Sequence, residues 1–259
     1  MKRKNRNNWF CIMKCLFLAA GYATRLYPLT ENFPKPLLEV KGKTILDWLV
    51  DDIDTYGQVD QYVVVSNHKF VNHFEKWAAD KSQNIIVLDD GTMMNETRLG
   101  AVKDIQFAIG ELKLDDDLLI IAGDNVLDFS LVEFIKYAQE KKTSCIMVYY
   151  EPKLERLRKS GVVVIGEEDR VIGMKEKPDK PESTWCCPPF YFIAKKDVPL
   201  VATGITAGCG TDAPGSFIAW LYKQVAVHAM EMPGKRYDIG TLENYEQIKQ
   251  SYNGIVYHS

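Results

Sequence analysis

Short apolar runs alternate with segments of helical periodicity through the first half of the chain. The runs are residues 15–20, 62–65, 85–88, 118–122 and 145–149. Those rich in Val and Ile suit strands that are buried on both faces of a parallel sheet. Between them, residues 45–56 and 99–112 carry apolar side chains at helical spacing, so each has one stripe to bury against the sheet. This alternation predicts a doubly wound, mostly parallel α/β sandwich.

The pattern changes after residue 151. Shorter runs at 162–165, 171–174 and 190–193 are separated by stretches rich in Gly, Pro and charge. A helix is expected at about 215–224, a strand near 227–232 and a last helix from 242 to about 252. We therefore expect a smaller α+β elaboration in the C-terminal half. No long linker interrupts the chain, so residues 13–259 are predicted to form one domain. Residues 1–12 are predicted to be a disordered polar extension, with Met13 as an alternative start of translation.

Composition narrows the class of partner. The chain has 259 residues, of which 46% are hydrophobic and 26% charged, and its formal net charge is −3. That balance is typical of a globular enzyme or binding domain and gives no footprint for nucleic acid. No run reaches the ~20 apolar residues of a membrane helix. The basic N-terminus resembles a secretory signal, but Lys14 interrupts its apolar stretch. Cleavage at Ala20 would also separate the first predicted strand from the loop that follows it, which carries candidate binding residues. A cytoplasmic protein is therefore expected.

A small-residue loop follows the first predicted strand. The sequence from Leu18 to Arg25, LAAGYATR, combines a glycine that lets backbone amides approach a ligand with a cation that can neutralise phosphate charge. Alone, a glycine after a strand is more often a simple turn. Support comes from Lys35, which lies between two prolines and is presented from a stiff, non-helical segment. The glycine spacing excludes both a Walker A loop and a dinucleotide-binding fingerprint.

Two further places carry charged side chains after apolar strands. Asp124 follows Gly123, where it is either an oxygen ligand for Mg²⁺ or the cap of a turn. Lys177 precedes a proline and can hold an acceptor phosphate. Asp238 comes just before the last predicted helix, so it is either a second metal ligand or a helix N-cap.

Five segments, taken in order, resemble the signatures of the sugar-1-phosphate nucleotidylyltransferases. They are residues 18–30, 34–38, 123–124, 176–178 and 238–241, and the likeness runs from about residue 13 to the C-terminus. The resemblance implies an Mg²⁺-dependent transfer of NMP from an NTP to a phosphorylated small molecule, with release of pyrophosphate. It implies nucleotide contacts at Ala20, Gly21, Tyr22, Ala23, Thr24, Asn95 and Gly100, catalytic cations at Arg25, Lys35 and Lys177, acceptor contacts at Gly161, Glu176 and Lys177, and metal ligands at Asp124 and Asp238.

The chemistry implied by this family needs no catalytic histidine. A phosphomonoester has a second pKa near 6 and is largely dianionic at pH 7, so it can attack the α-phosphorus without a general base. Catalysis then consists of aligning two anionic reactants and screening their repulsion with cations.

The sequence also departs from the family pattern. Ala23 replaces the usual second glycine, at a cost of roughly 1–2 kcal/mol if that position has a positive φ. Residues 211–221 are less like the glucose-1-phosphate enzymes than like small cytidylyltransferases. One alternative is therefore a CTP-dependent enzyme acting on phosphocholine, another phosphorylated amine or a phosphonate. Another is a catalytically silent nucleotide-binding subunit. Exposed edges of such sheets also allow a homo-oligomer.

Overall fold

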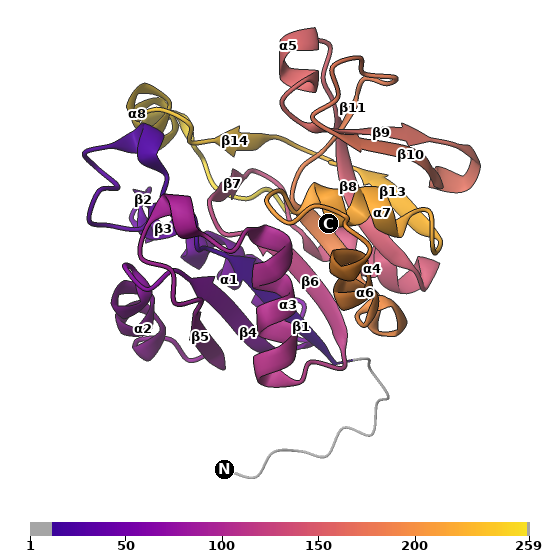
Figure 1. The fold of residues 1–259 in the computed structure, drawn as a ribbon. Helices are drawn as coiled ribbons and strands as arrows, with labels where there is room; N and C mark the ends of the chain where they lie inside the picture. Colours follow the sequence, from indigo (N-terminus) through magenta and orange to yellow (C-terminus); the bar gives the residue numbers. More distant parts are fainter. Residues whose placement is uncertain (1–11, 258–259) are drawn as a thin grey trace.

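A mixed sheet of ten strands forms the centre of the computed structural model, which describes residues 12–257 (Figure 1). The predicted extension at 1–12 therefore lies outside the described residues except for Ile12. Across the sheet, the strands are β10 (Val171–Glu176), β9 (Gly161–Ile165), β11 (Trp185–Cys187), β8 (Ser144–Tyr150), β12 (Phe190–Ile193), β6 (Asp117–Ala122), β1 (Met13–Leu18), β4 (Val59–Ser66) and β5 (Ile85–Asp89), and β13 (Val227–Glu231) pairs with β8. Two small ribbons pair β14 (Arg236–Asp238) with β7 (Asn125–Leu127) and β2 (Glu39–Val40) with β3 (Lys43–Thr44).

The strands β5, β4, β1 and β6 are parallel, as the alternating pattern predicts. Antiparallel β12 lies between β6 and β8, and β11, β9 and β10 continue from β8 as an antiparallel extension. The α/β sandwich and its C-terminal elaboration are thus confirmed. Because the carboxyl ends of the parallel strands meet at one edge, the loops that follow β1 and β6 lie side by side.

Helices cover both faces of the sheet. They are α1 (Ile45–Asp54), α2 (Val71–Ala79), α3 (Ala101–Leu112), α4 (Val132–Lys141), α5 (Leu154–Leu157), α6 (Leu200–Thr206), α7 (Gly215–Leu221) and α8 (Leu242–Ser251). Neighbouring strand residues point to opposite faces, so Phe17 packs in the cluster under α1, α2, α4 and α8, whereas Leu16 packs in the cluster under α3, α6 and α7. Within residues 12–257 no helix has the length and apolar character needed to cross a bilayer.

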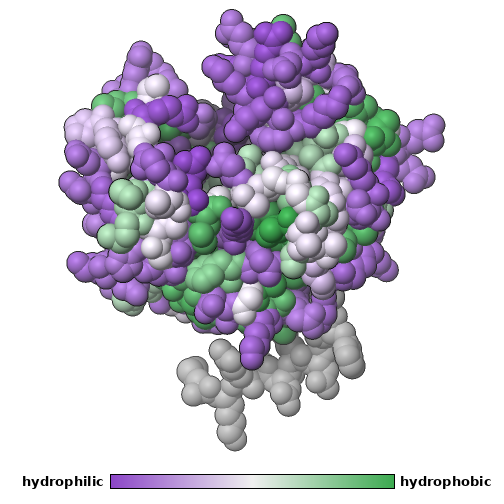
Figure 2. All heavy atoms as spheres, viewed as in Figure 1, coloured by the Kyte–Doolittle hydropathy of each residue, from purple (hydrophilic) through white to green (hydrophobic). Residues whose placement is uncertain are grey.

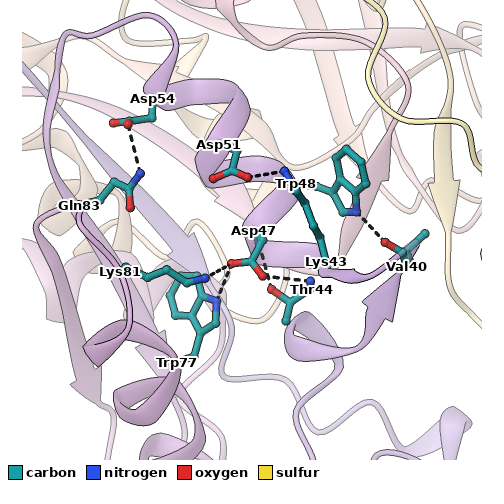
Figure 3. A network of polar contacts seen from close by, with 10 residues as sticks. All are labelled: Val40, Lys43, Thr44, Asp47, Trp48, Asp51, Asp54, Trp77, Lys81 and Gln83. Atoms are coloured by element: carbon teal, nitrogen blue, oxygen red, sulfur yellow. Dashed lines mark hydrogen bonds and ion pairs between the residues drawn. The ribbon is translucent and has the colours of Figure 1, made fainter.

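Helix α1 anchors the segment that carries Lys35. Thr44 and Asp47 form a capping box at its start, and Asp47 also accepts a hydrogen bond from the Trp77 indole of α2 at 2.9 Å (Figure 3). Trp48 donates from Nε1 to the Val40 carbonyl at 2.8 Å, which ties the helix to the β2–β3 ribbon (Figure 3). The stretch between β1 and α1 is therefore held at its C-terminal end.

The loop before α7 packs against Gly100, the residue just before helix α3. Gly100 has φ +92°, and a Cβ added to it would lie 2.5 Å from the Thr211 carbonyl oxygen. The first two amides of the helix, from Ala101 and Val102, donate to the carbonyls of Asp212 and Thr211 at 3.1 Å each. The N-terminus of α3 is thus capped by main chain that is distant in sequence.

We predict that Gly100→Ala lowers the free energy of unfolding by about 2–3 kcal/mol, because it combines a strained φ with a contact against backbone. Gly110→Ala in the same helix is the matched control. Its added Cβ meets nothing within 4 Å, and replacing a helical glycine should stabilise the protein by roughly 0.5–1 kcal/mol. Urea unfolding of both variants checks the pair, and equal effects would contradict the prediction.

Candidate active site

The loop after β1 is held from three sides. The Leu18 carbonyl accepts a hydrogen bond from the Gly123 amide at 3.0 Å, and the Ala20 carbonyl accepts one from the Asn67 side chain at 3.0 Å. Tyr22 is buried, and its hydroxyl donates to the Thr92 carbonyl at 3.0 Å. The tyrosine side chain therefore anchors the loop, and only its backbone faces the space where Gly21 is exposed.

Ala23 adopts the left-handed conformation, with φ 46° and ψ 41°. Its carbonyl accepts hydrogen bonds from the Leu26 amide and from the buried Thr30 hydroxyl, both at 2.9 Å. The loop thus keeps the positive φ that the family's glycine would favour, and alanine bears a strain of roughly 1–2 kcal/mol there. The two hydrogen bonds hold this conformation despite the strain. Thr24 and Arg25 follow in a short 3₁₀ turn and are exposed.

Lys35 and Asp124 form an ion pair with Nζ and Oδ2 2.6 Å apart. The lysine side chain is only 7% exposed, whereas the aspartate side chain is 41% exposed. Burial disfavours the charged form of Asp124, but the Lys35 ammonium and then Arg236 outweigh it, so the pKa of Asp124 is lowered. The carboxylate is therefore ionised at neutral pH.

A cavity of ≈ 240 Å³ brings several of the predicted residues together. Its lining includes Gly21, Ala23 and Arg25 from the loop after β1, together with Lys35 and Asp124. Segments separated by about 100 residues in sequence thus meet at the edge where β1 and β6 end. The cavity combines two cations, a carboxylate and a small-residue loop, which is an environment suited to phosphate groups.

A larger cleft of ≈ 980 Å³ opens beside this cavity, and Arg25 and Asp238 both line it. Figure 2 shows a hollow with a hydrophilic rim between the two upper lobes of the molecule. In the β14–β7 ribbon Asp238 lies opposite Asn125, the residue that follows Asp124 in the chain. The N-cap of α8 is Thr241, which rules out the capping role for Asp238. The cations lining the cleft are Arg25, Lys153, Arg156, Lys159, Lys235 and Arg236.

Sequence reasoning missed Arg236, which lies two residues before Asp238 on the same strand. Its Nη1 donates to Asn125 Oδ1 at 2.9 Å, and its guanidinium lies over the Tyr149 ring, 5.8 Å from the centroid. Because side chains alternate along a strand, residues 236 and 238 share a face. That spacing is the signal that could have identified Arg236.

The predicted acceptor residues meet on the antiparallel extension. Gly161 and Glu176 are partners in the β9–β10 ladder, and a Cβ on Gly161 would lie 3.0 Å from Glu176 Oε2. A Cβ on Gly215 would lie 2.2 Å from the same oxygen, so the carboxylate fits between two glycines. Burial raises the pKa of Glu176, although Lys177 opposes the shift. Lys177 itself is exposed, has φ 47° and donates its amide to the carbonyl of Ser160 at 3.0 Å. Ser160 lines the large cleft, whereas Lys177 lines neither the cavity nor the cleft.

Asn95 lies in the turn before α3 and is half-buried. Its backbone and side-chain oxygens both accept hydrogen bonds from Arg98 Nη1, at 3.0 and 3.2 Å. Arg98 in turn donates from Nε and Nη2 to Asp212 Oδ1, at 3.1 and 2.8 Å. The sequence alone does not reveal this contact between residues 114 positions apart.

The family model for nucleotidyl transferases matches residues 14–254. The chain belongs to the nucleotidyl transferase family. The bifunctional protein GlmU of Methanocaldococcus jannaschii is 30% identical over 231 residues, which are 88% of this chain and 51% of that protein. This nucleotidyl transferase thus spans about half the length of that relative. The UTP–glucose-1-phosphate uridylyltransferase AglF of Haloferax volcanii is 27% identical over 241 residues, covering 92% of this chain and 96% of that protein.

Solved structures share the fold of this nucleotidyl transferase. A UDP-glucose pyrophosphorylase complexed with UDP-glucose superposes with a TM-score of 0.77 at 22% identity, covering 93% of this chain and 98% of that one. The fold and the family expected from the five sequence segments are therefore confirmed.

Asp104 is a second charged residue that sequence reasoning missed. It lies in the first turns of α3 on the face buried against the sheet, and its Oδ1 has no hydrogen-bond partner among the described residues. Burial, and secondarily the charge of Asp90, raises the pKa of Asp104 to about 7. This nucleotidyl transferase therefore keeps a carboxyl group that is partly protonated at neutral pH.

We predict that Asp104→Asn gains stability relative to the parent as the pH rises from 4 to 8. The unfolded chain releases the Asp104 proton near pH 4, but the folded chain holds it until about pH 7, so the parent loses stability across this interval. Between pH 4 and pH 8, the free energy of unfolding of the variant minus that of the parent should rise by on the order of 2–4 kcal/mol. Urea unfolding at both pH values measures it, and a pH-independent difference would contradict the assignment.

Proposed function

We propose that this protein transfers NMP from an NTP to a sugar 1-phosphate and releases pyrophosphate. The observation that carries the proposal is the Lys35–Asp124 ion pair in a cavity that the glycine loop and Arg25 also line. Membership of the nucleotidyl transferase family supports it. A buried ammonium, an exposed guanidinium and a carboxylate grouped in this way suit a reaction in which phosphate charge must be held and redistributed.

The proposed reaction does not require a general base. An oxygen of the acceptor phosphate attacks the α-phosphorus, a phosphoanhydride bond forms, and the α–β bridging bond breaks with pyrophosphate as the leaving group. The acceptor is already largely dianionic at pH 7. Consistent with this, no histidine of the described residues lines the cavity or the cleft.

Each cation has a distinct role in this proposal. Arg25, exposed between the cavity and the cleft, stabilises the departing pyrophosphate. Lys35 is held rigidly by its ion pair and its flanking prolines, and it contacts the phosphates near the reacting phosphorus. Lys177 binds the acceptor phosphate, while Gly161 and Glu176 contact the acceptor itself. The loop from Ala20 to Thr24 lines the triphosphate, and Asn95 and Gly100 face the nucleobase.

The residues present suit Mg²⁺. Carboxylate oxygens are its preferred protein ligands, and Mg²⁺ bound to nucleotides commonly takes one or two carboxylates together with phosphate oxygens and water. Asp124 is held ionised by its neighbours, and Asp238 is exposed on the β14–β7 ribbon, opposite Asn125. Among the described residues there is no cluster of three or more His, Cys, Asp or Glu side chains that could hold a metal. In this proposal Asp124 and Asp238 would hold Mg²⁺, which would neutralise phosphate charge when bound.

The relatives favour a sugar 1-phosphate as acceptor. AglF is named for glucose 1-phosphate, and the alternatives of a phosphorylated amine or a phosphonate have no such support. The silent regulatory subunit is also disfavoured, because the chain keeps both lysines and both aspartates that the reaction needs. A single domain at 13–259, a cytoplasmic location and a homo-oligomer stay predictions.

We predict that Lys177→Ala and Asp124→Asn each lower the rate of pyrophosphate release at least a hundredfold, as expected when one charge-stabilising contact is lost. Lys35→Ala should do the same, but it also removes the partner of Asp124, so its folding must be checked by thermal unfolding. Lys43→Ala is the control, because Lys43 is exposed and paired with Asp51 at 2.7 Å and lines neither the cavity nor the cleft.

The assay measures pyrophosphate release with Mg²⁺ and crosses the common NTPs against sugar 1-phosphates, with phosphorylated amines and phosphonates as the competing acceptor pool. Full activity of the Lys177→Ala and Asp124→Asn variants would overturn the assignment of these residues. Turnover confined to the amine or phosphonate pool would overturn the choice of acceptor.

A further inference from the structure

The side chain of Asn95 is oriented by a guanidinium. Arg98 Nη1 lies 3.2 Å from Asn95 Oδ1 and 3.0 Å from its backbone oxygen. An arginine side chain has only donors, so the amide must turn its oxygen toward Arg98. The Nδ2 group, with its two hydrogens, is left to face away from the guanidinium. Asn95 is therefore available to a ligand as a hydrogen-bond donor.

Arg98 is itself held from the other side. Asp212 Oδ1 accepts from both Nε and Nη2 of Arg98, at 3.1 and 2.8 Å. The two side chains are 42% and 63% exposed, and an ion pair at such exposure contributes little to stability. The pair does, however, restrict the guanidinium to one orientation. Its main effect is thus geometric rather than energetic.

Asn95 lies close to the loop that lines the cavity. Thr92, three residues earlier, accepts a hydrogen bond from the Tyr22 hydroxyl at 3.0 Å, which joins this segment to the glycine loop. Gly100, five residues later, begins α3 with its positive φ. In the proposed function, this segment faces the base of a nucleotide whose phosphates lie in the cavity.

We propose that Arg98 and Asp212 are positioning residues that make Asn95 a donor to the nucleobase, so that the enzyme selects bases with a carbonyl on the reading edge. Uracil, thymine and guanine have that carbonyl, whereas cytosine and adenine present an amino group there. An amino group would meet the Asn95 Nδ2 hydrogens, and two donors cannot pair. This inference rests on the proposed function, because it assumes that the cavity holds an NTP.

The variants that test the proposal should fold. Substitution of Arg98 leaves intact the backbone hydrogen bonds from Ala101 and Val102 to the loop at 211–212, which hold the start of α3. Arg98→Met removes the guanidinium with little change in volume. Arg158→Met is the matched control, since Arg158 is an exposed arginine that donates to the Asp179 carbonyl and lines neither the cavity nor the cleft.

The experiment measures kcat/KM for UTP, dTTP, GTP, CTP and ATP with a fixed sugar 1-phosphate, together with equilibrium binding of each NTP without acceptor. We expect the parent to prefer its best carbonyl base over CTP and ATP by at least a hundredfold, as a site built to hydrogen-bond one partner rejects a mismatched one. Arg98→Met should reduce that ratio at least tenfold, and Arg158→Met should leave it unchanged. Asn95→Asp, which presents an acceptor, should shift preference toward CTP or ATP.

The outcomes separate this inference from the proposed function. Turnover that is equal or faster with CTP or ATP in the parent would overturn the inference alone. An Arg98→Met variant slowed equally with every NTP would also overturn it, because a purely structural role predicts that result. Selective binding of carbonyl bases without turnover would support the inference and contradict the proposed function.

Discussion

A lysine ammonium withdrawn from water needs a partner of opposite charge, and in this protein Lys35 finds it in Asp124. The contact joins the proline-flanked segment after β1 to the end of β6, which are 89 residues apart. It also keeps the carboxylate ionised, since the lysine outweighs the effect of burial on the pKa of Asp124. Charge balance thus sets the ionisation state of the carboxylate that lines the cavity.

The elements around this contact are built to keep it in place. Helix α1 is capped by Thr44 and Asp47 and is tied to the β2–β3 ribbon by Trp48, so the chain that carries Lys35 is restrained on its C-terminal side. The glycine loop is restrained by Tyr22 and Asn67. Because these supports are buried, the exposed Gly21 and Arg25 are held on a rigid frame. A frame of this kind lowers the entropy cost of aligning two anionic substrates.

A second set of contacts links the two halves of the site. The main chain at 211–212 caps α3, and Asp212 holds Arg98, while the same loop leads directly to Gly215 beside Glu176. The residues predicted to contact the nucleotide and those predicted to contact the acceptor therefore share one loop. Gly100 permits this arrangement, because a side chain at that position would collide with the Thr211 carbonyl. The close approach of two backbones, rather than a side-chain interaction, holds the loop against the helix.

Local patterns in the sequence determined most of the fold. Apolar runs identified the parallel strands, and amphipathic stripes identified α1 and α3, since such patterns reflect burial that each element needs on its own. They did not single out α2 or α4, whose buried stripes consist of three residues each, or β11, which has three residues in all. The stability of these elements comes mainly from tertiary contacts rather than from their own periodicity.

The residues of the candidate site also fall into two groups, those that the sequence predicted and those that only the structure revealed. The rule that ligands meet the carboxyl ends of parallel strands pointed to Gly21 and Asp124 from sequence, and the two flanking prolines pointed to Lys35. Only the tertiary structure decided that Arg98 reaches Asp212, that Arg236 neighbours Asp124, and that Asp104 is buried without a partner. These contacts join residues distant in the chain or depend on burial by other elements. A sequence records which groups are available, but the distances that set their charge and orientation exist only after the chain has folded.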